Sequence, residues 1–136
     1  FDQEVALTLL AVLVPAVWWA WGRYASVTFA AVVALVIPMW LVDLAYRPRP
    51  TEDLVWSEAL RGGYPSGHAV FVVLVFGTLA LLARRHIPGP TGRRMAAALW
   101  TLVALACWLR VSRLEHWPAD VLGGVLFALP LTLIHL

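Results

Sequence analysis

Residues 62–83 read GGYPSGHAVFVVLVFGTLALLA and contain no aspartate, glutamate, lysine or arginine. A membrane-spanning helix needs about 17–25 predominantly apolar residues, so this segment is long enough to cross a bilayer. It begins with the tetrapeptide PSGH, in which Ser66 is a favoured N-cap for the apolar helix that follows. His68 places a titratable imidazole at the start of that helix, which is unusual for a membrane-spanning segment. The role of this histidine has to be inferred from the other motifs of the sequence.

Four other segments also lack charged side chains: residues 5–22, 24–42, 95–109 and 121–136. The first two are long enough to span a membrane, and the last two need a thinner bilayer or a few flanking residues. Across the chain 62% of residues are hydrophobic and 13% are charged, whereas soluble domains have about 45–50% and about 25%. A soluble bundle of five buried helices is the alternative, but helices that are apolar all round leave no face for water.

We therefore predict an all-α transmembrane helical bundle that forms a single integral membrane domain over residues 1–136. The five predicted spans cover residues 5–22, 24–42, 66–83, 95–109 and 118–136. Cys107 lies inside the fourth span and is the only cysteine of the chain. It is therefore interpreted as a small buried apolar residue.

Five spans assign the connecting loops to two sides of the membrane. One side holds Arg23, Arg84, Arg85, Arg93 and Arg94. The other side holds all eight acidic residues together with Arg47, Arg49, Arg61, Arg110 and Arg113. Basic residues in short loops favour the cytoplasmic side, and here the two sides carry equal numbers. If the five arginines on the acidic side are there for a functional reason, they do not count towards the orientation. The arginine-rich loop of residues 83–94 is then the cytoplasmic one. We therefore predict an integral protein of the cytoplasmic (plasma) membrane whose acidic side faces outward.

Two motifs on the outward side carry groups that bind anions. In RPRP (residues 47–50) each proline holds the preceding arginine in an extended conformation. A single guanidinium group can donate two parallel hydrogen bonds to phosphate oxygens. The alternative is a proline-rich helix stop with solvated charges. In PSGH the helix start offers free N–H groups and a positive dipole end, which favour an anion. The alternative there is a capped helix with an interfacial histidine.

The motif HWPAD (residues 116–120) supplies groups for covalent chemistry. Pro118 favours a helix start, so Asp120 lies in the first turn and His116 stands just before it. The carboxylate can accept the Nδ1–H of the imidazole, which leaves Nε2 as a nucleophile or base. The alternative is an acid that only stabilises the helix N-terminus.

Two arginines precede this motif in a short turn. Arg110 is ionisable and close to lipid, which favours a functional role, whereas Arg113 could simply pair with Glu115 among the headgroups. On one face, two histidines, an orienting aspartate, several arginines and two helix N-termini predict a phosphate site with its own nucleophile and acid. The sequence has no Cys/His cluster or carboxylate set typical of a metal site, so we expect no metal and no cofactor.

These motifs resemble the tripartite signature of the type 2 phosphatidic acid phosphatase superfamily, KxxxxxxRP, PSGH and SRxxxxxHxxxD. The resemblance covers residues 42–124. The first block matches at Arg49-Pro50 and the second is intact at residues 65–68. The third block matches at Arg110, His116 and Asp120 and is followed by VLGG.

Two positions depart from the signature. Val42 stands where the family has lysine, and Leu109 stands where it has serine. Arg47 is an auxiliary candidate to supply the charge of the missing lysine. Arg113 and the serine before it are candidates for a shifted copy of the Ser-Arg pair that begins the third block. Members commonly have six spans, so we expect that one span preceding Val5 is absent from this sequence. Because it begins with Phe1 rather than Met, we expect a trimmed chain.

The resemblance implies a role for each matching residue. His116 is expected to attack phosphorus and form a phosphohistidine, while Asp120 holds its tautomer. His68 is expected to protonate the leaving oxygen. The groups expected to bind the equatorial oxygens of the phosphate are Arg49, Arg110 and the amides around Ser66 and Gly67.

The activity that the resemblance implies is a metal-independent lipid phosphate phosphatase acting on a phosphomonoester or a pyrophosphate. Candidate substrates are polyprenyl pyrophosphates such as undecaprenyl pyrophosphate, phosphatidic acid and phosphatidylglycerol phosphate. The expected partners are this lipid and the bilayer, and not nucleic acid. Two alternatives stay open. A lipid phosphotransferase would use the same phosphohistidine, and a non-catalytic module that binds anionic lipid is favoured by the missing lysine.

Overall fold

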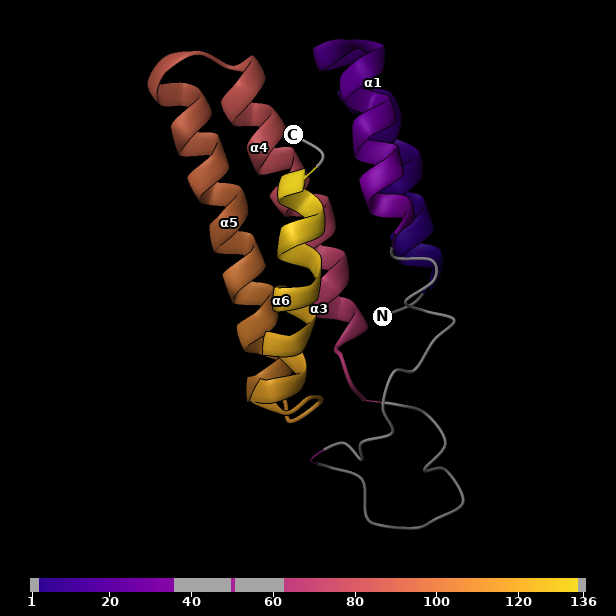
Figure 1. Cartoon of the computed structure of the whole chain (residues 1–136), viewed down its shortest axis with the longest axis vertical. Helices are drawn as coiled ribbons and strands as arrows, with labels where there is room; N and C mark the ends of the chain where they lie inside the picture. The colour runs from indigo at the N-terminus through magenta and orange to yellow at the C-terminus, as the bar shows by residue number, and fades with distance from the viewer. Residues whose placement is uncertain (1–2, 36–49, 51–62, 135–136) are drawn as a thin grey trace.

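The computed structural model describes residues 3–35, 50 and 63–134, and within them every regular element is a helix. In chain order these are α1 (Gln3–Ala34), α3 (Gly67–Val72), η1 (Val73–Gly77), α4 (Thr78–His86), α5 (Gly89–Ser112) and α6 (Pro118–Ile134). The segments α3, η1 and α4 continue one another as a central rod, and α1, α5 and α6 pack around it (Figure 1). The all-α prediction is confirmed.

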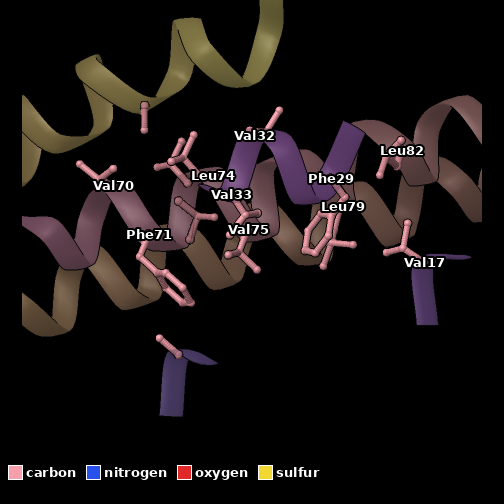
Figure 2. Close-up of a cluster of buried hydrophobic side chains, with 14 of the residues drawn as sticks. Val17, Phe29, Val32, Val33, Val70, Phe71, Leu74, Val75, Leu79 and Leu82 are labelled. Carbon is pink, nitrogen blue, oxygen red and sulfur yellow. The ribbon is translucent and has the colours of Figure 1, made fainter. Parts of the chain in front are cut away.

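The central rod, Gly67–His86, contributes half of the buried hydrophobic residues of the described chain, because its sequence is apolar all round. Figure 2 shows the cluster, in which the rod contributes Val70, Phe71, Leu74, Val75, Leu79 and Leu82, and α1 contributes Val17, Phe29, Val32 and Val33. The helices α1 and α5 instead leave most of their apolar side chains exposed. This division is what a bundle in lipid requires, because close packing rather than exclusion of water holds such helices together.

The helix α1 is bent sharply at Gly22, whose φ of 83° and ψ of 175° are non-helical. Ser26 Oγ donates a hydrogen bond to the carbonyl oxygen of Val14 at 3.0 Å, and in a straight helix these residues would be about 18 Å apart. The chain therefore folds back at Gly22 (Figure 1). The predicted boundary between the first two spans lies at this bend.

By length and composition, three helical stretches could cross a membrane: Glu4–Ala34, Gly67–His86 and Gly89–Ser112. The helix α6 is apolar but shorter. Five separate spans are not shown, because α1 counts as one bent helix and the second predicted span continues beyond the described residues. The helix α5 extends beyond the fourth predicted span, 95–109, at both ends and includes arginines there, whose long side chains can reach the interface.

Candidate functional site

Three helix ends meet at one end of the bundle: the N-terminus of α3, the C-terminus of α5 and the N-terminus of α6 (Figure 1, lower end). The connection between α5 and α6 is short, so the two helices run antiparallel and return the chain to the start of α3. This convergence brings the PSGH and HWPAD motifs together although they are far apart in the sequence. The predicted clustering of the two motifs is therefore observed.

Ser66 begins the central rod and joins it to α6. It is the N-cap of α3, with φ −64° and ψ 110°, and its Oγ accepts a long 3.5 Å hydrogen bond from Ala69 N. Its own backbone N–H donates to the carbonyl oxygen of Asp120 at 2.9 Å. The first turns of the two helices are thus connected through the backbone, and Ser66 is fully buried between them.

Gly124 makes this close contact between the helices sterically allowed. A Cβ at this position would lie 2.7 Å from the carbonyl oxygen of Ser66 and 2.9 Å from the Cβ of Ala69. At the neighbouring Gly123 a Cβ would lie 2.7 Å from the ring of Tyr64. The VLGG sequence after Asp120 therefore has a packing role, because it lets α6 approach the start of the rod.

His116 and Asp120 are both buried, with 6% and 1% of their surfaces exposed. The imidazole Nδ1 lies 3.9 Å from Asp120 Oδ2, which is beyond the length of a well-formed hydrogen bond. The same Oδ2 accepts a hydrogen bond from the backbone N–H of Trp117 at 3.0 Å. A side chain in the first turn that returns to the N-cap N–H is half of a capping box. Asp120 therefore caps α6 and also lies close to the imidazole, and its orienting role towards His116 stays a prediction.

His68 lies across from His116. The two ring centroids are 6.2 Å apart and the rings are tilted by 60°. His68 follows the buried N-cap Ser66 of α3 by two residues, and His116 precedes Pro118, the first residue of α6, by two residues. Two side chains capable of proton transfer or nucleophilic attack therefore lie near each other at this end of the bundle.

Arg110 lies at the end of α5, where its backbone and side chain both contact the following turn. Its carbonyl oxygen accepts hydrogen bonds from the backbone N–H groups of Glu115 at 3.1 Å and His116 at 3.2 Å. Its guanidinium Nη1 forms an ion pair with Glu115 Oε2. The alternative that Glu115 pairs with Arg113 is therefore wrong, because the turn bends the glutamate back towards Arg110.

A cavity of about 190 Å³ lies between α3 and α5 at this end of the bundle. It is lined by His68, Ala69, Phe71, Val72, Ala106, Cys107, Leu109, Arg110, Arg113 and Glu115. One half of this lining is charged or titratable and the other half is apolar. The cavity therefore adjoins the histidine pair and could admit a ligand that has both polar and apolar parts.

Most of the predicted site residues are at this end of the bundle. His68, Ser66, Gly67, Arg110, His116 and Asp120 lie together, and Arg113 is at the exposed rim of the cavity. Arg47, Arg49 and Val42 lie outside the described residues, so their predicted places are not tested. Sequence reasoning missed Glu115 and Gly124. The spacing of Gly124, one helical turn after Asp120, is a signal that could have identified it.

Within the described ranges, no group of three or more His, Cys, Asp or Glu side chains lies close enough together to hold a metal ion. The arrangement consists instead of two imidazoles, the carboxylates of Asp120 and Glu115, and the guanidinium groups of Arg110 and Arg113. These groups can bind an anion, act as a nucleophile and transfer protons.

Comparison with known proteins gives one match. Residues 29–135 match the sequence model of the PAP2 superfamily, and this range includes every described residue of the site. No curated protein and no solved structure matches the chain.

Proposed function

The chain belongs to the PAP2 superfamily, and from this premise we propose that it is a lipid phosphate phosphatase working through a phosphohistidine intermediate. The observation that carries the proposal is the buried His116–Asp120 pair facing His68 across 6.2 Å. Burial of an imidazole beside a carboxylate orients the ring and supports attack by its other nitrogen. A non-catalytic anion-binding module would not require this arrangement.

In the first step of the proposed mechanism, Nε2 of His116 attacks phosphorus and the bond from phosphorus to the leaving oxygen breaks. His68 gives a proton to that oxygen, so that the lipid leaves as an alcohol or as a shorter phosphate. In the second step a water molecule attacks the phosphohistidine, His68 takes a proton from the water, and inorganic phosphate is released. Asp120 holds the tautomer of His116 and stabilises the positive charge that the ring carries in the intermediate.

Binding of the phosphate is assigned in the proposal to groups with positive charge or free N–H donors. Arg110 contributes its guanidinium, and the amides around Ser66 and Gly67 contribute the positive end of the rod. Arg49 is assigned the same role through the resemblance. Phosphoryl transfer depends mainly on positioning and charge stabilisation, so these groups would lower the barrier without forming covalent bonds.

The location of the site at helix ends supports a substrate embedded in the bilayer. Apolar helices indicate an integral membrane protein, and a site at the ends of these helices lies at the depth of lipid headgroups. We propose that the bundle crosses the membrane five times and that the site faces outward. The proposed substrate classes are polyprenyl pyrophosphates, phosphatidic acid and phosphatidylglycerol phosphate.

The experiment that tests this proposal is phosphate release from these lipids in detergent, with the wild type beside His116→Ala. We expect release by the wild type and a loss of at least about 10³-fold in the variant, since removal of a nucleophile leaves only binding and charge effects. Equal release by both proteins would reject His116 as the nucleophile. Transfer of phosphate to an acceptor other than water would identify a phosphotransferase.

A further inference from the structure

The lining of the cavity between α3 and α5 changes from polar at the rim to apolar further in. The proposed mechanism uses His68 and Arg110 at the rim but none of the apolar residues. On α3, His68 is followed one helical turn further into the bundle by Phe71 and Val72. On α5, which runs the opposite way, Arg110 is preceded one turn further in by Ala106 and Cys107. Both helices therefore place polar groups at the rim and apolar groups on the floor of the cavity.

The floor offers few hydrogen-bond partners to a ligand. Phe71 is buried and its ring is apolar, Val72 and Ala106 end in methyl groups, and a cysteine thiol is only a weak donor. The whole cavity, with its polar rim, has a volume of about 190 Å³, and its apolar floor is therefore only part of that space, whereas an entirely apolar cavity that binds benzene has roughly 150 Å³. The floor therefore suits a few carbon atoms and not a complete lipid chain.

We propose that this cavity is a subsite for the apolar carbon atoms next to the substrate's phosphate, with Cys107 forming its inner wall. The proposal rests on the proposed function, because a phosphate held between His68 and Arg110 places the adjoining carbons against the floor. The subsite favours a hydrocarbon attached directly to the phosphate oxygen. A glycerol backbone fits it less well, because its ester oxygens would lack hydrogen-bond donors there.

Replacing Cys107 by phenylalanine tests the subsite by filling the floor. We would compare hydrolysis of farnesyl phosphate with that of acetyl phosphate, which carries the same transferable group and no hydrocarbon chain. The expected result is a rise of at least about tenfold in KM for farnesyl phosphate, within the range seen when an apolar pocket is altered. The KM for acetyl phosphate should rise by much less, because this substrate does not extend to the floor of the cavity.

Leu105→Phe is the matched control, since Leu105 lies two residues away on α5 and is 52% exposed. It adds the same ring outside the cavity and should alter neither reaction. An equal loss of activity on both substrates in Cys107→Phe, or a rise in KM for farnesyl phosphate in Leu105→Phe, would overturn the subsite.

A second measurement does not depend on turnover or on the folding of a variant. Cys107 is the only cysteine in the chain, so the rate of its reaction with N-ethylmaleimide in lipid nanodiscs reports on the cavity. Decylphosphonate, which cannot be hydrolysed, should slow this reaction several-fold, and methylphosphonate should not. The same rate with and without decylphosphonate would overturn the proposal, and so would a thiol that never reacts.

The two proposals fail in different ways. If decylphosphonate protects Cys107 but the wild type hydrolyses neither substrate, the subsite stands as a binding site and the phosphatase proposal fails. If His116-dependent hydrolysis of acetyl phosphate is seen without protection of Cys107, the phosphatase proposal stands and the subsite fails.

Discussion

The bundle has two tight connections between helices, at opposite ends of α5. One joins α4 to α5 and the other joins α5 to α6 (Figure 1). Each contains a residue in the left-handed region: Gly89, with a φ of 73°, at the first and Leu114, with a φ of 56°, at the second. Glycine adopts this conformation without a steric penalty, whereas for leucine it costs about 1–2 kcal/mol. The second connection therefore holds backbone strain that the first avoids.

The charged side chains near the two connections also differ, in their burial and in their pairing. Arg84, Arg85, Arg93 and Arg94 near the first connection are exposed. Near the second connection His116 and Asp120 are buried and Arg110 is paired with Glu115. Strained backbone and desolvated charge both cost stability and both concentrate where a protein binds or reacts. One end of α5 therefore has an unstrained connection with exposed charges, and the other has a strained connection beside buried polar side chains.

The largest expected difference between the ends concerns the buried carboxylate. Asp120→Asn keeps the shape of the side chain, but its amide can donate to the imidazole and favour the wrong tautomer. We expect phosphatase turnover to fall by at least about 10²-fold, in the direction known for catalytic dyads of this kind. Arg93→Gln, at the opposite end, should leave turnover unchanged. Equal turnover in Asp120→Asn and the wild type would mean that Asp120 serves only to cap α6.

A smaller effect is expected from the contact between the helix starts. Alanine normally stabilises a helix by about 0.8–1.0 kcal/mol relative to glycine, but at Gly124 its Cβ would lie 2.7 Å from a carbonyl oxygen of the rod. Gly124→Ala should therefore displace α6 from Ser66 and lower turnover by about tenfold, as misplaced catalytic groups do. Gly89→Ala, which meets no atom within 4 Å, should leave turnover intact. Equal turnover in the two variants would reject Gly124 as a positioning residue.

The smallest expected effect is on stability alone. Leu114→Gly removes the left-handed strain, and the gain is partly offset by the greater freedom of glycine in the unfolded chain. We expect a net stabilisation of about 0.5 kcal/mol, measured as a higher Tm in detergent, with turnover unchanged. Gly89→Ala should lower Tm instead. A lower Tm in Leu114→Gly would show that the leucine side chain contributes more than its backbone conformation costs.

The sequence was sufficient to predict the helices and the clustering of the two motifs. Runs without charge identified the core of each helix, and Arg23 between two such runs indicated the break that is found at Gly22. The run without charge does not define the ends of α5, because arginines extend readily from a helix to the interface. Local patterns therefore predicted where helices lie better than where they end.

Other features of the site depend on tertiary contacts that no local pattern carries. Arg110 pairs with Glu115 because the turn reverses, and the left-handed Leu114 in this turn contradicts the ordinary preference of leucine. The role of Gly124 appears only when the backbone of Ser66 is placed opposite it. The cavity at Cys107 likewise requires the relative position of α3 and α5. These features were beyond sequence reasoning because each involves two segments whose contact the pattern of either one does not specify.

The most direct test of the central claim is to trap the phosphorylated enzyme. Wild type, His116→Ala and His68→Ala would be mixed with a ³²P-labelled lipid phosphate, quenched rapidly in alkali and digested to locate the label. The account predicts label on the peptide that contains His116 in the wild type and none in His116→Ala. Label on another residue, or label retained by His116→Ala, would contradict it.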